Sequence, residues 1–215
     1  MQMESVGILI DMRPLNERDS LARIFSRDFG VLVGVMRGAA VAKKNRPLVG
    51  QVGMMTWNAR LDTQLGTFHW EAERNLAAPL MTDMGRLGLM MSAFALIVTL
   101  LPEREESAAL YDETLELLRD VAAGAGRDAY LGWELNLLRE LGYALDLSRC
   151  AGCGGRDGLR YLSPRTCRAV CAVCGAPYAS RLYRLPITLD VTRALLDAVC
   201  AGLGVELPQA RRAVC

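Results

Sequence analysis

The chain is poor in the residues and motifs that enzymes most often use. Its 215 residues include one histidine, His69, and only 6% of them are aromatic. Ser–His or Cys–His catalysis would have to use that one imidazole, and no GxSxG nucleophile elbow accompanies it. A Walker A phosphate loop is also missing, which excludes a P-loop ATPase. We therefore expect neither a catalytic triad nor ATP-driven chemistry.

Long apolar segments are scarce as well. The longest uncharged run covers residues 87–101, fifteen residues that end at Pro102. A membrane span needs about 20 residues, so this run predicts a buried helix instead. Apolar residues make up 52% of the chain, which indicates a globular protein with a sizeable core. No targeting segment is visible, and we expect a cytoplasmic protein.

Cysteine, by contrast, occurs in two matched pairs. Four cysteines form two CxxC motifs, each followed by glycine: Cys150, Cys153, Cys171 and Cys174. Two residues between thiolates let one turn point both sulfurs at one ion, and a positive φ at Gly154 and Gly175 would close each turn. The seventeen residues between the pairs match the spacing of a four-cysteine zinc ribbon. Because four thiolates leave no open position on the metal, we expect a structural Zn²⁺.

Other uses of the cysteines fit the sequence less well. Paired disulfides need an oxidising compartment, and the seven cysteines are an odd number. A redox pair would need one CxxC beside a βαβ unit. Cys167 has neither the spacing nor the following glycine of a ligand, so we interpret it as a bystander. We expect Cys200 in the core and Cys215 as a free thiol.

A zinc nucleobase deaminase is the best enzymatic alternative. The HxE motif of that class is satisfied by His69-Trp70-Glu71, and CxxC motifs follow it. That chemistry needs a proline before the CxxC motif and an open zinc position for water. Here Arg149 and Val170 precede the two pairs. We therefore interpret His69 as a solvent-facing residue of a strand.

The net charge of +1 hides an uneven distribution along the chain. Residues 29–61 contain no acid and five basic residues: Arg37, Lys43, Lys44, Arg46 and Arg60. Residues 76–146 have a balance of −7, and residues 147–185 have a balance of +6. Two basic segments predict a polyanionic partner. The alternative to a polyanionic partner is that the first basic segment is only a solvated loop, and that the arginines of the second offset a zinc–thiolate centre of formal charge −2.

Alternating apolar and polar residues in 5–73 predict five short strands. Breaks at Phe29-Gly30, Arg37-Gly38 and Leu65-Gly66 indicate hairpins. Five strands without an intervening helix predict a small closed barrel, with the basic stretch between its third and fourth strands. Three aromatic residues fall on the apolar phase of their strands, which favours the barrel core over base-stacking platforms: Trp57, Phe68 and Trp70.

The period changes to a helical one after Pro79. Asp83 is a candidate cap for the apolar helix, and residues 102–106 carry the proline and acids expected in the first turn of a second helix. Its buried face would contain Leu110, Thr114, Leu118 and Val121. A third helix should bury Leu131, Leu135, Leu138 and Leu141 and end at Gly142. Helical spacing returns over 190–203, after the cysteine pairs.

The order of these predicted parts, from an N-terminal barrel with a basic loop through acidic helices to a four-cysteine ribbon, resembles that of the RecO family of bacterial recombination mediators. The matching segments are Glu4 to Arg13, Arg27-Asp28-Phe29-Gly30, Gly66-Thr67-Phe68, Pro102-Glu103, Glu134 to Tyr143 and Asp146 to Cys174, followed by Leu185-Pro186. The strongest part runs from Glu134 to Cys174. One departure is Cys167, which stands where the family commonly has glycine.

The resemblance implies an α+β fold without a catalytic centre. Residues 1–75 would form an OB-fold barrel, and residues 76–215 a helical domain with a zinc ribbon inserted at about 148–178. Arg13, Arg37, Lys43, Lys44 and Arg46 are then the candidate DNA contacts.

The same resemblance implies a mediator of DNA repair, cytoplasmic and associated with the nucleoid. It would bind single- and double-stranded DNA, anneal strands and, together with RecR, help to load RecA onto strands coated by single-strand-binding protein. Arg139 is the candidate contact for the acidic C-terminal tail of that protein. The alternative is a zinc-ribbon adaptor that binds proteins and not DNA.

Overall fold

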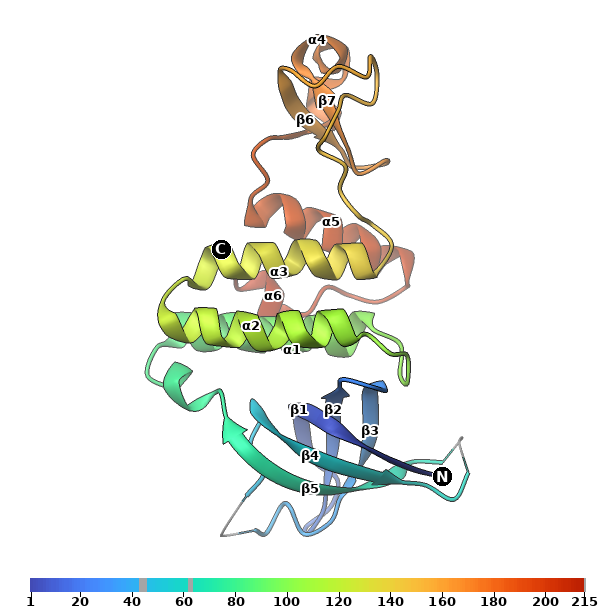
Figure 1. Ribbon diagram of the computed structural model, residues 1–215, viewed down its shortest axis with the longest axis vertical. Helices are drawn as coiled ribbons and strands as arrows, with labels where there is room; N and C mark the ends of the chain where they lie inside the picture. Colours follow the sequence, from blue (N-terminus) through green and yellow to red (C-terminus); the bar gives the residue numbers. More distant parts are fainter. Residues whose placement is uncertain (43–45, 62–63, 215) are drawn as a thin grey trace. The chain divides into compact units, whose positions relative to one another are not determined.

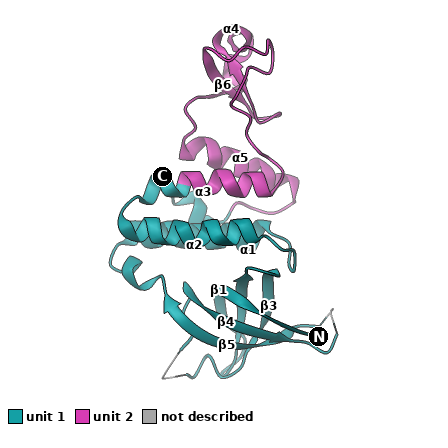
Figure 2. Ribbon diagram, in the orientation of Figure 1, with its two compact units in different colours: residues 1–130, 208–214 teal, residues 131–207, 215 magenta. Residues whose placement is uncertain are grey.

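The computed structural model describes residues 1–42, 46–61 and 64–214. Its contacts divide the chain into two compact units, coloured separately in Figure 2. The first comprises Met1–Tyr130 with Pro208–Val214, and the second comprises Leu131–Leu207. Among the described residues, no helix combines the length and the apolar character that crossing a membrane requires.

A closed five-stranded barrel forms the N-terminal part of the first unit (Figure 1). Its strands are β1 (Gln2–Pro14), β2 (Ser20–Ser26), β3 (Gly30–Met36), β4 (Gln51–Asn58) and β5 (Gly66–Asn75). They are ordered β1-β2-β3-β5-β4, and β4 pairs with β1 to close the ring. This is the topology of an OB fold, as expected from the sequence. All five strands end by residue 75, while a domain boundary at that point stays a prediction.

The barrel core depends on two glycines where β3 meets β5. Gly34 and Gly66 lie opposite each other in the parallel pairing of these strands. A Cβ on Gly66 would lie 2.0 Å from the Trp57 ring, and one on Gly34 would lie 2.9 Å from the Phe68 ring. Trp57 is fully buried and its indole N–H donates to the carbonyl of Val33 at 2.9 Å. Only glycine therefore lets the two strands approach across these rings.

One of the three expected hairpins is wrong. The breaks at Gly30 and Gly66 join antiparallel neighbours, β2–β3 and β4–β5. The break at Arg37-Gly38 does not, because β3 pairs with β2 and β5 while β4 pairs with β1 and β5. Gly38 instead has φ +68 and donates its N–H to the carboxylate of Asp19 at 2.9 Å. The chain turns there toward the loop between β1 and β2, and two residues later the N–H of Ala40 donates to the carbonyl of Arg18.

The segment 102–106 is also not the first helical turn that its proline and acids suggested. The second helix, α2, covers Ala108–Ala123 and begins after Ser107. Glu103 forms an isolated parallel bridge with Val31, and the N–H of Arg104 donates to the carbonyl of Val31 at 3.0 Å. The Arg104 guanidinium lies over the Trp57 ring, 4.7 Å from its centroid. These contacts with the barrel hold the segment in a non-helical conformation, in which Arg104 has φ +65.

Two further expectations about the first unit are confirmed. α1 covers Met84–Leu100, and the side chain of Asp83 caps it by accepting from the N–H groups of Gly85 and Arg86. The predicted face of α2 is buried in full: Leu110, Thr114, Leu118 and Val121. The remaining short helices of this unit are η1 (Ala78–Leu80) and α6 (Gln209–Arg212).

The third helix, α3 (Gly126–Glu140), buries a different face from the one expected. Leu138 is buried, but the other three leucines of the predicted stripe are only half-buried. The buried positions are Tyr130, Trp133, Glu134, Leu137 and Leu138, which recur at the i, i+3, i+4, i+7 spacing of a helix.

The end of α3 follows the prediction. Gly142 has φ +86 and donates to the carbonyl of Arg139 at 3.0 Å, while Tyr143 donates to the carbonyl of Leu138 at 2.7 Å. These two hydrogen bonds form the Schellman motif that ends a helix at glycine. Further along the second unit, Thr192 of α5 (Leu189–Gly202) donates to the buried carboxylate of Glu134 at 2.5 Å.

A small three-stranded sheet lies between α3 and α5 in the sequence. Its order is β7-β6-β8, with β6 (Leu159–Ser163), β7 (Arg168–Cys171) and β8 (Tyr183–Arg184). The short helices α4 (Ala172–Gly175) and η2 (Ala176–Arg181) connect β7 to β8. The sheet and its loops form the predicted ribbon inserted in helical sequence.

Candidate metal centre and nucleic-acid interface

The two CxxC motifs bring their four sulfur atoms together in the second unit. All four Sγ atoms lie within 4.8 Å of one another, and those of Cys153 and Cys171 are 3.9 Å apart. A tetrahedral zinc centre with Zn–S bonds of about 2.3 Å needs sulfurs about 3.8 Å apart. Among the described residues this is the only such group of metal-ligating side chains. These four cysteines can therefore hold a metal ion.

Backbone N–H groups point at the sulfurs from both motifs. Gly152 and Cys171 each donate to the Sγ of Cys150 at 3.3 Å, and Cys174 donates to the Sγ of Cys171 at 3.4 Å. Such hydrogen bonds stabilise thiolates, because each N–H points its positive end at the sulfur. The motifs are therefore folded to present anionic sulfur.

The thiols also oppose each other's ionisation. N–H groups of Cys171 and Cys153 lower the pKa of the Cys150 thiol from 9.0 to about 6. Hydrogen bonds from the Cys174 thiol to the sulfurs of Cys171, Cys153 and Cys150 raise the pKa of Cys174 to about 12. One site cannot hold four negative sulfurs without a cation, because the charges repel at this distance. A divalent ion would satisfy that requirement.

The glycines after the two motifs have different roles. Gly154 has φ +76, as expected. Gly175 has φ −84, so the prediction of a positive φ there is wrong. Its need for glycine is steric, since a Cβ would lie 2.4 Å from the Tyr161 ring.

Cys167 lies outside the sulfur group, as its spacing suggested. It is buried, and burial raises the pKa of its thiol. Its φ is +51, a left-handed backbone conformation that favours glycine. Cys200 is buried in α5, as predicted, and Cys215 lies outside the described residues.

The basic stretch follows β3 in the first unit. Arg37 and Arg46 are exposed, while Lys43 and Lys44 lie outside the described residues. The β1–β2 loop contacts the start of this stretch, because the N–H of Ala40 donates to the carbonyl of Arg18 at 3.0 Å. Arg13 and Arg18 of that region are also exposed. The fold thus adds cations from β1 and its following loop to those of the stretch.

A second hydrogen bond between the β1–β2 loop and the basic stretch places an acid, Asp19, beside the stretch. Asp19 accepts the N–H of Gly38, and this hydrogen bond, the Asn16 amide and the charges of Arg37 and Arg18 lower the pKa of its carboxyl group. The basic stretch itself contains no acid, but the fold places Asp19 beside it. Asp19 stays ionised and partly offsets the neighbouring arginines.

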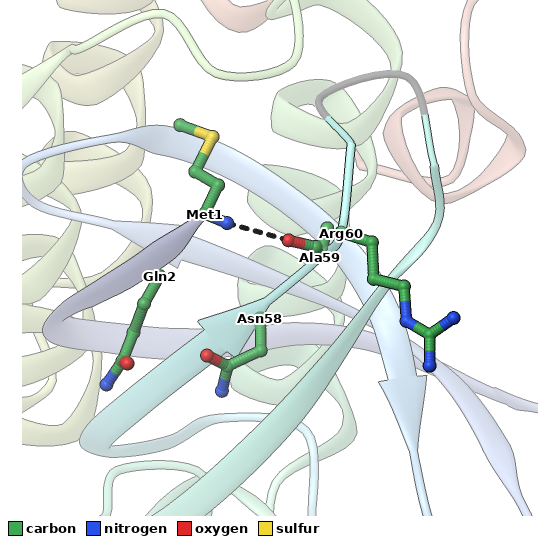
Figure 3. Close-up of a pocket in the computed structure, with 5 residues that line it drawn as sticks. All are labelled: Met1, Gln2, Asn58, Ala59 and Arg60. Atoms are coloured by element: carbon green, nitrogen blue, oxygen red, sulfur yellow. Dashed lines mark hydrogen bonds between the residues drawn. The ribbon is translucent and has the colours of Figure 1, made fainter.

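A shallow hollow of about 430 Å³ opens on the barrel where β1 meets β4 (Figure 3). Gln2 and Asn58 are cross-strand partners there, and Figure 3 shows their amide groups on the same side as the Arg60 guanidinium. Met1 and Ala59, which also line the hollow, are joined by two backbone hydrogen bonds. Arg60 is visible in the sequence as one of the basic residues, but no sequence signal marks the two amides, because their partnership depends on strand pairing.

The aromatic residues of the barrel divide into two groups. Trp57 and Phe68 are buried in the core, as favoured from their strand phase. Trp70 is only half-buried, and its indole N–H lies 3.5 Å from the Gln51 side chain. His69 is exposed on β5 and lies 3.0 Å from Glu71, which confirms the solvent-facing interpretation.

Arg139 is exposed in the last turn of α3 and has an interaction within the protein. Its assignment to a partner peptide stays a prediction. The helical segment around it is acidic in sequence, so this arginine stands out by its charge.

An OB-fold barrel with exposed cations, followed by helices and a four-cysteine ribbon, defines a class of protein that joins an OB fold to a cysteine-ribbon module. The comparisons with known proteins agree with that class. Two family profiles match, described as "Recombination protein O N terminal" over residues 1–73 and "Recombination protein O C terminal" over residues 81–200.

Several bacterial proteins named "DNA repair protein RecO" are similar to the chain. The protein of Jannaschia sp. (strain CCS1) is 38% identical over 208 residues, covering 95% of this chain and 84% of that protein. The protein of Rhodospirillum centenum is 40% identical over 190 residues, covering 86% and 76%. That of Rhodospirillum rubrum is 38% identical over 209 residues, covering 94% and 83%. The chain belongs to the RecO family, which confirms the resemblance seen in its sequence.

Proposed function

We propose that this chain is a non-enzymatic, DNA-binding mediator of recombinational DNA repair. It binds single- and double-stranded DNA through the barrel, residues 1–75, and anneals complementary strands. The observation that carries the proposal is the OB-fold barrel whose exposed arginines come from two loops joined by a hydrogen bond, at Ala40 and Arg18. Membership of a family of DNA repair proteins supports the same role.

The chemistry of the proposed contacts is electrostatic. Arg13, Arg37 and Arg46 are exposed, and together with Lys43 and Lys44 they would neutralise backbone phosphates without reading bases. Annealing needs strands whose phosphates are neutralised and whose bases remain free to pair. Such a surface provides both conditions without a nucleophile or a general base.

The ribbon cysteines fit a structural Zn²⁺ by number, spacing and donor type. Cys150, Cys153, Cys171 and Cys174 would hold it, and the metal would fix the fold of the ribbon. The ion would have no open position, so it would take no part in chemistry.

The partners in this proposal are RecR, RecA and single-strand-binding protein. With RecR, the chain would help RecA to load onto strands coated by single-strand-binding protein. The acidic tail of that protein would dock near Arg139, because a guanidinium binds carboxylates through paired hydrogen bonds. Such a role belongs in the cytoplasm, at the nucleoid.

The test replaces Arg37, Lys43, Lys44 and Arg46 together by glutamine. Affinity for all DNA sequences should fall alike, and the log–log salt slope on single strands should flatten by about 2–3 units. Annealing should fail in parallel, with folding and metal content unchanged. The helical control variant, Arg119→Gln/Arg127→Gln/Arg193→Gln, removes cations from α2, α3 and α5 and should bind as wild type does. Wild-type affinity and slope in the quadruple variant would instead favour the adaptor alternative.

A further inference from the structure

The ribbon carries more positive charge than its metal centre needs. Residues 147–185 hold seven arginines against Asp157 alone, a balance of +6. A zinc–thiolate centre of formal charge −2 would lower this balance only to about +4. The sulfurs already accept hydrogen bonds from backbone N–H groups of Gly152, Cys171 and Cys174. Offsetting the thiolates therefore does not account for the arginines.

Six of these seven arginines are left without side-chain partners among the described residues. Arg168 pairs with Asp146 at 3.4 Å. The other six are exposed, and within the described ranges their side chains make no hydrogen bond or ion pair: Arg149, Arg156, Arg160, Arg165, Arg181 and Arg184. Arginines elsewhere in the chain do pair, such as Arg23 with Asp11 at 2.7 Å. Six solvated guanidinium groups on one small module create a strong positive potential.

Three of the six lie on or next to the β8 edge of the ribbon sheet: Arg184 on β8, Arg160 on the adjacent strand β6, and Arg181 at the end of η2. The order β7-β6-β8 makes β8 an edge strand, and Arg184 lies opposite Tyr161 in its pairing with β6. Arg160 is the neighbour of Tyr161 on β6, and its carbonyl accepts the N–H of Leu185 at 3.0 Å. Arg181 ends the helix η2 just before β8.

An aromatic ring lies beside this edge. Tyr178 is 59% exposed, and it precedes Arg181 by three residues in η2. Side chains at i and i+3 of a 3₁₀ helix eclipse each other, so the Tyr178 ring and the Arg181 guanidinium share one face. No residue of η2 is buried, which leaves that face open to a ligand within this part of the chain.

We propose that this edge, formed by Arg160, Arg181, Arg184 and Tyr178, is a second binding site for single-stranded nucleic acid. The guanidinium groups contact successive phosphates, and the Tyr178 ring stacks on a base. An exposed ring beside a row of cations is the combination that binds single strands without regard to sequence. An acidic peptide would use the arginines but would offer no base for the ring.

This inference rests on the proposed function and extends it to annealing. The barrel and the ribbon belong to different compact units, so each can carry its own strand. One chain with two polyanion sites can hold two strands at once, which raises the effective concentration of one strand near the other.

The test uses the full-length, metal-loaded chain and two oligothymidine strands, one with a donor dye and one with an acceptor. Thymidine strands do not pair, so energy transfer reports two strands on one protein assembly. The edge variant Arg160→Gln/Arg181→Gln/Arg184→Gln should lose this transfer while still binding one strand. Its log–log salt slope should flatten by about 2 units, because three contacts at about 0.7 each are removed. The helical control variant, which removes the same number of charges, should behave as wild type.

A second variant tests the ring. Tyr178→Ala should weaken binding about fivefold or more, while Tyr178→Phe should retain the wild-type affinity because it keeps the stacking surface. Metal content and circular dichroism establish that each variant is folded.

Three outcomes would overturn the proposal while leaving barrel binding intact. One is an edge variant with wild-type energy transfer and salt slope. Another is an edge variant that loses binding to a polyglutamate peptide but keeps its binding to oligothymidine. The third is a Tyr178→Ala variant with unchanged affinity. A wild-type chain that binds no oligothymidine would refute the proposed function itself, so the two failures are distinguishable.

Discussion

Removing the metal should unfold the ribbon and leave the barrel intact. Apart from the cysteines, the buried side chains of the ribbon are Leu162 and Ala169, which contribute about 2–3 kcal/mol of apolar burial. Ordering the backbone of one residue costs about 1–2 kcal/mol, so this burial offsets only about one to three ordered residues. Structural zinc sites contribute about 10–16 kcal/mol, which is enough to fold such a module. The metal, and not a core, should decide whether the ribbon is folded.

The assay compares hydrogen exchange of the ribbon amides before and after chelation. The N–H groups of Ala151 and Ala169 make hydrogen bonds of 2.8 Å with the carbonyls of Ala169 and Asp146. Their protection should be lost on chelation, while that of β1–β5 stays within about twofold. The double variant Cys153→Ser/Cys174→Ser should behave like the chelated protein and retain no zinc. Protected ribbon amides in a protein shown by elemental analysis to be metal-free would refute the reasoning, and so would zinc bound by the double variant.

Three further predictions concern single residues. Gly66→Ala should destabilise the barrel by about 3 kcal/mol or more, because its Cβ meets the buried indole at 2.0 Å. The control is Gly88→Ala in α1, where an added Cβ would meet no other part of the protein within 4 Å; it should be neutral or stabilising by up to about 1 kcal/mol. Equal melting temperatures of the two variants would contradict the close approach at Gly66. Asp19→Asn keeps an oxygen that can accept the Gly38 N–H but removes a negative charge, so DNA affinity at low salt should rise about twofold. A decrease in affinity, measured by fluorescence anisotropy, would argue against DNA binding at this loop. Arg139→Glu should weaken the binding of an acidic tail peptide at least tenfold in calorimetry, and an unchanged affinity would remove that residue from the site.

Local signals in the sequence predicted much of this architecture. The spacing of the cysteine pairs predicted a cluster that the structure forms, because each CxxC turn is a local feature. Period-2 alternation predicted the barrel strands, and Asp83 and Gly142 marked helix ends through local hydrogen bonds.

The errors arose where distant residues meet. Residues 102–106 have the composition of a helix start, but bridging to Val31 and the stacking of Arg104 on Trp57 keep them out of the helix. The parallel pairing of β3 with β5 joins segments about thirty residues apart, so no turn signal marks it. The position of Asp19 beside the basic stretch was missed for the same reason, because a count of charges along the chain cannot show which loops contact each other.

The salt dependence of DNA binding tests the central proposal most directly. The affinity of the wild-type chain for a fluorescent oligothymidine should be measured from about 50 to about 400 mM salt. The four basic residues of the stretch alone predict a log–log slope of about −2.8, and any further contact makes it steeper. A steep linear slope with little dependence on base composition would support a phosphate-binding mediator. A slope near zero, or no binding at the lowest salt, would contradict it and leave the protein-binding adaptor as the better description.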